Sequence, residues 1–401
     1  MGVNIINAAR PRVALPSLAW ALLVLISPDS VTVAQGVHGA GSSLADSSPV
    51  ESSAIVHIGV LGLFRPLELT VSPAVGSALQ VRAGQERIVL EKSSGVDSAS
   101  IRIISTSEDG EPSEVIVTAG RHVVRAPKII VSGRNNDPAD FILAVPHKIT
   151  RHYRGILEIK PSSATLIAIV AMDRETAVAS VVAAESSPET PLEALKAQAV
   201  ATRSYLVASR GRHQEFDFCD TTHCQFLREP PAPGTAAAKA SAATRGLVLA
   251  YDSHPIAAMY TRSCSGRTRT PAELGLSPSL AAYPYYSVEC KHCQAHPVRW
   301  SSRISTHDAA LLHSSDESAR LSIDRRLGWN AVPSNDFVVK AEPDQEMKGR
   351  SITGQIVVEG TGQGHGIGLC QAGARAMAEE GADFRQILHH YYPNTTVVTS
   401  R

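Results

Sequence analysis

The sequence predicts a mixed α+β fold, in which helices carrying the candidate site residues pack on β-structure around an open cleft, preceded by a β-rich N-terminal region. Short β-branched runs separated by turn residues fill residues 55–150. Two stretches with helical spacing follow between residues 173 and 205. A glycine-rich turn at 362–368 then leads into a final helical stretch.

The N-terminus has the layout of a secretory signal peptide. Arg10 and Arg12 precede an apolar run at 13–26, and small residues at 32–34 offer a cleavage site. A membrane anchor is the alternative, but Pro16 interrupts the run, which is shorter than the roughly 20 residues of a spanning helix. We expect a signal peptide at 1–34 and a Ser/Gly/Ala-rich linker at 35–54. The mature protein would then be secreted or periplasmic, associated with the cell envelope, and without a transmembrane segment.

The composition is that of a globular protein without a dominant charge. Of the 401 residues, 43% are hydrophobic and 19% are charged. Lys plus Arg total 38, and Asp plus Glu also total 38, so no net field attracts a polyanion. We therefore expect no nucleic-acid partner.

Residues 55–150 are expected to be mostly β. Turn residues such as Gly120 separate β-branched runs at 88–90, 101–104, 115–117 and 129–131. The region has no cluster of acids, histidines or cysteines, so we expect it to have a supporting or binding role. The remaining chain, 151–401, holds the candidate chemistry.

The first helix is expected to begin after Asp173, a suitable N-cap residue, and to end before Pro188. One face carries three valines followed by Glu185, at the i, i+3, i+4 and i+7 positions. Burial beside these valines would raise the pKa of Glu185, which suits a general acid. The alternative is that Glu185 only caps or salt-bridges the helix end.

The second helix is expected to open at Thr190, with Pro191 at the first helical position. Glu193 stands three residues after Thr190, which predicts a capping box. Lys196 and Arg203 are seven residues apart and therefore share a face of this helix.

The C-terminal part mixes both kinds of element. Short apolar runs at 247–249 and 356–358 predict strands. The helix after the glycine-rich turn should end at Gly381, and a shorter helix should run from Asp383 to just before Pro393.

Three motifs, in order along the chain, resemble the SpoIID/LytB family. They are AVASVVAAE at 177–185 with PLEALKAQAVATRSY at 191–205, YTRSCSGRT at 260–268, and GQGHGIGLCQAGA at 362–374. The resemblance covers about residues 153–393. The family is named for a sporulation protein that degrades peptidoglycan and for an enhancer of a cell-wall amidase.

The resemblance implies a peptidoglycan lytic transglycosylase that cleaves glycan strands after N-acetylmuramic acid and leaves 1,6-anhydro ends. It implies that Glu185 is the catalytic acid/base. It also implies that further residues bind the glycan, namely Lys196, Gln198, Arg203, His365 and Gln371. The alternative is a non-catalytic module that binds the cell wall and enhances an N-acetylmuramoyl-L-alanine amidase. Expected partners are peptidoglycan glycan strands and, for the alternative, a cell-wall amidase.

The first group of cysteines is accompanied by histidines. Two thiolates and two imidazoles within twelve residues can complete a closed tetrahedral zinc site, and they come from His213, Cys219, His223 and Cys224. Some relatives in the resembling family hold zinc with a similar run. We expect structural zinc here, and the alternative is a Cys219–Cys224 disulfide with bystander histidines.

The second group comprises Cys264, Cys290, Cys293 and Cys370. Cys290 and Cys293 have the C-x-x-C spacing of a metal or redox pair, and Cys264 and Cys370 belong to two of the motifs above. Either a second metal or two disulfides fits this pattern, and the sequence leaves both open.

Overall fold

A computed structural model of the chain describes residues 54–104, 114–162, 164–276, 283–313, 315–328, 330–340 and 355–400. The expected signal peptide and, apart from Ala54, the expected linker lie outside these residues. Within them, no helix combines the length and the apolar character that crossing a bilayer requires.

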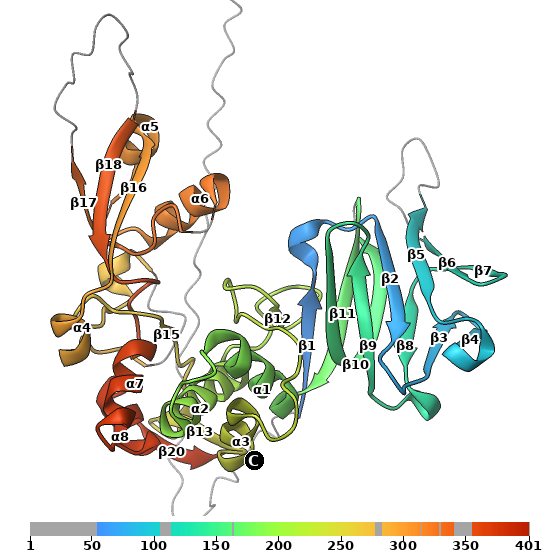
Figure 1. Ribbon diagram of the computed structural model, residues 1–401, viewed down its shortest axis with the longest axis horizontal. Helices are drawn as coiled ribbons and strands as arrows, with labels where there is room; N and C mark the ends of the chain where they lie inside the picture. Colours follow the sequence, from blue (N-terminus) through green and yellow to red (C-terminus); the bar gives the residue numbers. More distant parts are fainter. Residues whose placement is uncertain are drawn as a thin grey trace, which may run out of the picture. The chain divides into compact units, whose positions relative to one another are not determined.

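Most of the described β-structure belongs to one 12-stranded sheet. Its strands are β1 (Ile55–Val60), β2 (Glu68–Pro73), β3 (Leu79–Ala83), β4 (Glu86–Leu90), β5 (Ala99–Ile104), β6 (Glu114–Ala119), β7 (His122–Ala126), β8 (Ile129–Ser132), β9 (Ala139–Val145), β10 (Ile149–Ser162), β11 (Thr165–Asp173) and β12 (Phe218–Cys219). The main path runs β12-β1-β11-β10-β9-β2-β5-β6-β7, with β8 joining β10 to β3, and β3 pairing with β4 (Figure 1). The four β-branched runs expected before residue 150 are confirmed as parts of β4, β5, β6 and β8.

Strand β10 curls this sheet by changing partners halfway along its length. Residues 149–155 pair with β9, whereas residues 156–162 pair with β11. Gly155 stands at the change, where a Cβ would lie 2.5 Å from the carbonyl oxygen of Ala171. Only glycine allows the two strands to approach so closely. Apolar side chains from both halves of the sheet fill the interior, among them the fully buried Leu69, Val71, Ile101, Val131, Leu143 and Leu157.

The expected fold class is wrong in its proportions and in its arrangement. Among the described residues, strands hold 38% and helices 28%, so the protein is mixed α+β but mostly β, with a nearly closed barrel-like sheet. Helices α1 (Arg174–Glu185) and α2 (Leu192–Ala208) pack chiefly on each other and on α3 (Ala236–Ala243). A sheet that closes on itself buries its apolar face internally, so it offers helices little open surface to cover.

The start of α1 confirms the N-cap prediction, whereas the start of α2 does not have the predicted capping box. The Asp173 carboxylate accepts hydrogen bonds from the Glu175 and Thr176 backbone N–H groups. Helix α2 begins one residue later than expected, with Pro191 as its N-cap and no side-chain cap. The Glu193 carboxylate instead accepts hydrogen bonds from Lys196 Nζ and from a distant backbone N–H group.

That distant group belongs to Phe384, at the first residue of α8 (Phe384–Tyr391). Helices α7 (Gln371–Glu379) and α8 lie beside α2 (Figure 1). The capping of α8 confirms its predicted start, because the Asp383 side chain and Gln386 form a reciprocal capping box. These helices pack with β13 (Leu247–Tyr251) around a second apolar core.

The remaining elements are short. Strand β13 pairs with β14 (His254–Pro255) and β20 (Thr396–Thr399), and β15 (Tyr260–Thr261) pairs with β19 (Leu369–Cys370). A third small core lies under a separate sheet made of β16 (Arg299–Ser305), β17 (Asp336–Lys340) and β18 (Gln355–Thr361), with α5 (Thr306–Leu311) and α6 (Glu317–Leu327). The runs expected as strands at 247–249 and 356–358 lie in β13 and β18.

Candidate functional site

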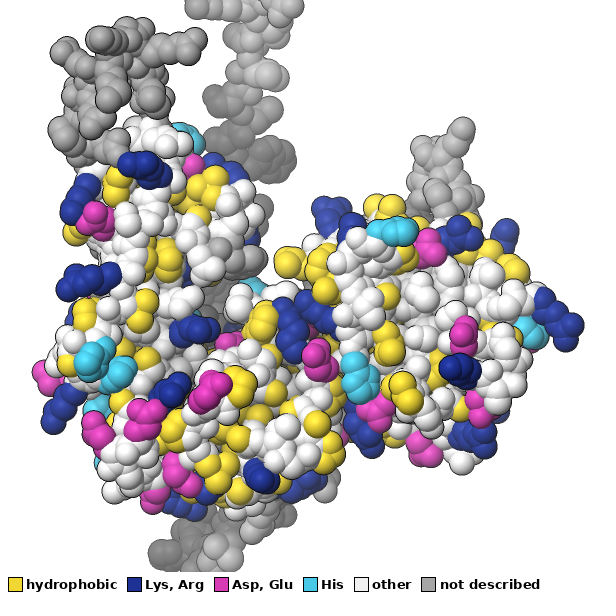
Figure 2. All heavy atoms as spheres, viewed as in Figure 1, with side chains coloured by type: hydrophobic (Ala, Val, Ile, Leu, Met, Phe, Trp, Pro, Cys, Tyr) yellow, Lys and Arg dark blue, Asp and Glu magenta, His cyan; other side chains and the backbone are white. Residues whose placement is uncertain are grey.

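A cavity of about 1170 Å³ brings together segments that are far apart in the sequence. Its wall is made mostly of loops and helix ends, including the end of α1, the loop at 220–228, the segment at 257–262, part of α6 and the glycine-rich turn. Aromatic side chains such as Tyr205, Tyr260 and Tyr283 line it together with several arginines. On the face of the protein shown in Figure 2, basic and acidic side chains are interspersed rather than gathered by sign.

Glu185 is the last residue of α1, and its half-buried side chain lines this cavity. Burial raises the pKa of Glu185 to about 7. A hydrogen bond from the backbone N–H of Phe226 and the positive charges of Arg262 and Arg228 act in the opposite direction. The carboxyl group is therefore able to give up and take back a proton near neutral pH.

Glu185 differs from the other acidic residues in the cavity wall. Asp220 is ion-paired with Arg151 at 2.7 Å, and α6 supplies Glu317 and Asp324, which pair with Arg320 at 2.6 and 3.0 Å. Among the described residues, Glu185 has no such partner. The arginine partners favour the charged form of these three acids and hold the pKa of Glu317 below its usual value, whereas burial raises the pKa of Asp220 and Asp324. Glu185 is therefore distinguished from them by the absence of an ion pair within the described part of the chain.

Gln371 connects the end of α1 to α2. From the first position of α7, its Nε2 atom donates to the backbone carbonyl of Glu185 at 3.2 Å and to Gln198 Oε1 at 3.5 Å. Gln371 lines the cavity, whereas Gln198 is buried behind it and does not. The first and last family motifs thus meet at Glu185.

His365 also lines the cavity. Its Nδ1 atom accepts a hydrogen bond from the Ile367 backbone N–H at 3.0 Å, and the ring also hydrogen-bonds to the backbone of Tyr260. Burial lowers the pKa of His365, so the neutral ring is favoured. A neutral ring with Nδ1 as acceptor carries its proton on Nε2.

Lys196 and Arg203, like Gln198, were expected to bind the glycan but lie outside the cavity lining. Lys196 pairs with Glu193 at 2.6 Å on the side of α2 that faces α8. Arg203 is fully buried and makes two hydrogen bonds to Glu175, at 2.6 and 2.8 Å, and one to the carbonyl of Leu247 at 3.0 Å. Arg203 therefore joins α2 to α1 and β13.

Tyr260 is a cavity residue that the sequence analysis did not single out. Its hydroxyl donates to Gln225 Oε1 at 3.2 Å. Burial raises the pKa of Tyr260 well above its usual value, and the nearby charge of Glu185 raises it further. The sequence signal for Tyr260 is its position as the first residue of the YTRSCSGRT motif.

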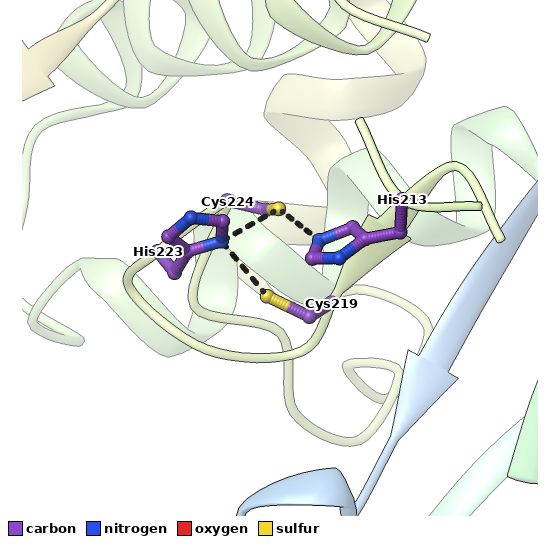
Figure 3. A group of neighbouring side chains, drawn as sticks. All are labelled: His213, Cys219, His223 and Cys224. Carbon is purple, nitrogen blue, oxygen red and sulfur yellow. Dashed lines mark hydrogen bonds between the residues drawn. The ribbon is translucent and has the colours of Figure 1, made fainter. Parts of the chain in front are cut away.

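The first group of cysteines and histidines forms a compact cluster, shown in Figure 3. The ligand atoms of His213, Cys219, His223 and Cys224 all lie within 4.8 Å of one another. His213 Nε2 lies 3.3 Å from Cys224 Sγ, and His223 Nδ1 lies 3.7 Å from Cys219 Sγ and 3.6 Å from Cys224 Sγ. Both thiols are free.

These separations fit a metal ion at the centre of the cluster. With Zn–S of about 2.3 Å and Zn–N of about 2.0–2.1 Å, a tetrahedral centre has S···N edges of roughly 3.6 Å. His223 and Cys224 also belong to the cavity wall, and β12 anchors Cys219 against β1 at the edge of the sheet. The cluster can therefore hold a metal that braces the loop beside Glu185.

The second group of cysteines also converges. The sulfur atoms of Cys264, Cys290, Cys293 and Cys370 lie within 4.8 Å of one another, and all four residues are buried, free thiols.

Comparison with known proteins connects the segment around Glu185 to a described family. Residues 162–251 match the model of the SpoIID family, described as "Stage II sporulation protein". The matched segment contains Glu185, Gln198 and the whole His-Cys-His-Cys cluster.

Three relatives extend the similarity beyond that segment. An uncharacterized protein of Brachyspira hyodysenteriae is 28% identical over 269 residues, which cover 61% of this chain and 72% of the relative. A stage II sporulation protein D of Bacillus amyloliquefaciens is 25% identical over 263 residues, covering 56% and 73%. An amidase enhancer of Bacillus subtilis is 26% identical over 274 residues, covering 52% of this chain but 38% of the relative. The motifs, the matched segment and these relatives together support the resemblance of this chain to the SpoIID/LytB family.

Proposed function

We propose that this protein acts on the bacterial cell wall as a peptidoglycan lytic transglycosylase. It cleaves glycan strands after N-acetylmuramic acid and leaves 1,6-anhydro ends, with Glu185 as general acid and then general base. The observation that carries the proposal is the state of Glu185, which lines a large cavity, has a raised pKa and forms no ion pair among the described residues.

In this mechanism, the protonated Glu185 carboxyl group donates its proton to the glycosidic oxygen, and the bond from that oxygen to the anomeric carbon breaks. The 6-hydroxyl oxygen of the same N-acetylmuramic acid then bonds to the anomeric carbon. Its proton passes to the Glu185 carboxylate, which restores the acid. Because the sugar supplies the nucleophile, a second free carboxylate is not required, unlike in most glycosidases. The ion-paired states of Asp220, Glu317 and Asp324 are compatible with this requirement.

The neighbours of Glu185 suit both of its protonation states. Burial favours the acid before the reaction, while the Phe226 N–H group, Arg228 and Arg262 stabilise the carboxylate formed by proton transfer. Gln371 positions the end of α1 through the backbone of Glu185, and Gln198 positions Gln371. His365 holds the glycine-rich turn against Tyr260. Lys196 and Arg203 support the reaction by holding α2 in place.

The proposal includes zinc at the first cluster. His213, Cys219, His223 and Cys224 would hold the ion, whose role is structural because four protein ligands leave no open position. The loop that the cluster fixes places Gln225, Phe226 and Arg228 in the cavity wall. Loss of the ion would therefore act on Glu185 through this loop.

The proposed setting is the cell envelope. Residues 1–34 would direct export, residues 35–54 would act as a linker, residues 55–150 would support or bind, and residues 151–401 would carry the catalytic residues. The partner would be the glycan strand itself.

A second candidate function is enhancement of a cell-wall amidase without catalysis. The similarity to a relative named Amidase enhancer favours it, and that similarity covers 52% of this chain. Under this alternative the cavity binds glycan, and Glu185 performs no proton transfer.

Product analysis separates the two candidates. Peptidoglycan, with and without prior removal of stem peptides, is digested with wild type, Glu185→Gln and the control Glu189→Gln, and products are identified by mass spectrometry. Glu189 is a fully exposed acid near the same helix end, so it controls for the loss of charge alone. We expect anhydro-muramyl products from wild type and Glu189→Gln, and none from Glu185→Gln. Absence of products from both substrates with wild type, together with a faster amidase in the same mixture, would establish the second candidate instead.

A further inference from the structure

The four buried cysteines join three segments of the second core. Cys264 follows β15, Cys290 and Cys293 flank the start of α4 (Lys291–Ala295), and Cys370 ends β19 and is the N-cap of α7. All four belong to the apolar core around α2, α7 and α8. None of them lines the cavity described above.

Their geometry is that of a tetrahedral ligand set. All four sulfur atoms lie within 4.8 Å of one another, and Cys293 Sγ lies 3.6 Å from Cys370 Sγ. A zinc ion with Zn–S bonds of about 2.3 Å requires S···S edges of roughly 3.8 Å. Two disulfides would instead draw the sulfurs together in pairs, and all four thiols are free.

Hydrogen-bonding groups surround the sulfur atoms. The Gly373 backbone N–H donates to Cys370 Sγ at 3.4 Å, and the hydroxyl oxygens of Ser263 and Tyr391 lie 3.5 Å from Cys293 Sγ and Cys290 Sγ. Such contacts orient metal-ligating thiolates and offset part of their charge. In an otherwise apolar core, four thiolates need this compensation as well as a cation.

Gly373 shows how closely the backbone approaches this cluster. A Cβ at this position would lie 2.5 Å from Cys290 Sγ and 2.0 Å from the Tyr391 hydroxyl oxygen. Any side chain here would displace a sulfur from the tetrahedron. Gly373, in the third motif, therefore leaves space for the sulfur cluster.

The segments that the cluster joins have little regular structure of their own. Strands β15 and β19 pair over two residues each, and isolated bridges such as Ser263 with Gln363 supply further pairing. The same segments carry Tyr260 and Gln371, which line the cavity. A multivalent cation would fix them more firmly than so few backbone hydrogen bonds can.

We infer that Cys264, Cys290, Cys293 and Cys370 hold a structural Zn²⁺ ion as a tetrathiolate centre, separate from the His-Cys-His-Cys cluster. Four sulfur ligands in a tetrahedron select zinc or iron among the common metals, and a closed structural site without redox chemistry is typical of zinc. This inference goes beyond the proposed reaction and does not depend on it.

Metal content tests the inference without any activity measurement. Zinc per chain is measured by elemental analysis and native mass spectrometry on the full-length protein. The variants are Cys290→Ser/Cys293→Ser and, as matched control, Cys219→Ser/Cys224→Ser. We expect the first pair of substitutions to remove one zinc ion per chain relative to wild type, and the control to retain the ion at the second cluster. Unchanged zinc in the first variant, or iron in place of zinc, would overturn the inference.

A second measurement covers the case in which the first variant does not fold. The control variant, whose second cluster is intact, is loaded with Co²⁺ and its visible absorption is recorded. We expect the intense thiolate-to-cobalt bands and tetrahedral d–d bands of a four-sulfur site. Their absence, or the detection by mass spectrometry of disulfides linking these four cysteines in freshly purified protein, would show that the cluster holds no metal.

Discussion

Gln371 Nε2 donates a hydrogen bond of 3.2 Å to the backbone carbonyl of Glu185, across 186 positions of sequence. The same amide group reaches Gln198 on α2 at 3.5 Å. The end of the helix that carries Glu185 is thus held from two directions. Under the proposed reaction, this contact places the carboxyl group without touching the substrate bond.

Replacing Gln371 with leucine should therefore impair catalysis more than folding. Loss of one hydrogen bond of about 1 kcal/mol would lower kcat roughly fivefold, with a small change in KM. The measurement is steady-state cleavage of glycan strands, with the melting temperature as a check on folding. Gln371→Glu keeps an acceptor but loses the donor, so it should not restore the rate. Equal rates for all three proteins would show that this contact has no catalytic role.

The rate should depend on the protonation of Glu185. Because the raised pKa of Glu185 is about 7, the acid form dominates below that pH, and kcat/KM should fall roughly tenfold per pH unit above it. Arg262 lowers the pKa of Glu185, so Arg262→Gln should move the alkaline limb to higher pH. The pH–rate profiles of wild type and this variant provide the test. An alkaline limb that does not move in Arg262→Gln would contradict the assignment of that limb to Glu185.

The free energy of unfolding should also depend on the protonation of Glu185. The folded-state pKa of Glu185 lies above its ordinary value of 4.5, so folding favours the protonated form. The associated stability is fully present below pH 4.5 and is lost as pH rises through about 7, with a change of up to about 3 kcal/mol in the free energy of unfolding. Glu185→Gln should lack this loss and unfold at a higher urea concentration than wild type at pH 8. Parallel pH dependences of the two proteins would argue against a raised pKa.

Removal of metal from the His-Cys-His-Cys cluster should loosen the loop at 220–228. We expect Cys219→Ser/Cys224→Ser to lower the melting temperature and to reduce glycan cleavage, because this loop supplies Phe226 and Arg228 beside Glu185. Proteolysis should become faster within the loop. Wild type stripped of metal with a chelator should show the same losses as this variant and should recover on addition of Zn²⁺. Full activity in the absence of zinc would show that the metal does not hold the loop in place.

Arg203 should act on stability rather than on substrate binding. Its guanidinium group is buried and bound to Glu175, so Arg203→Met leaves an uncompensated carboxylate and should cost about 3–5 kcal/mol in the free energy of unfolding. The double variant Arg203→Met/Glu175→Gln should recover much of that loss. Urea unfolding of the single and double variants measures both effects. A large increase in KM with an unchanged free energy of unfolding would instead indicate that Arg203 binds the glycan.

Much of the local structure could be predicted from the sequence. The Asp173 and Asp383 caps, the short β-branched strands and the end of α1 at Glu185 all follow from short-range patterns, because capping and side-chain periodicity act within a few residues. The spacing of His213, Cys219, His223 and Cys224 likewise indicated a cluster, since the four residues share one loop. The motif that ends at Glu185 likewise identifies this residue from the sequence, through the family resemblance.

Contacts between distant segments could not be predicted in this way. Gly155 lets β10 change partners, and this curls the sheet, whereas the expectation was of helices packed on β-structure around an open cleft. Glu193 binds the Phe384 backbone N–H group instead of capping its own helix. These outcomes depend on which partner is nearest after folding, and helical or strand periodicity gives no information about that.

What the sequence by itself determined was the set of chemical groups and the local elements that carry them, Glu185 at the end of an apolar helix above all. Only the tertiary structure decided which acids are neutralised by arginine, which cysteines meet, and that Lys196 and Arg203 lie away from the cavity. The physical reason is that burial and ion pairing are properties of a site assembled from distant segments. The pKa of Glu185 is raised by the cavity wall around it, which the chain completes only when residues 226, 262 and 371 come together.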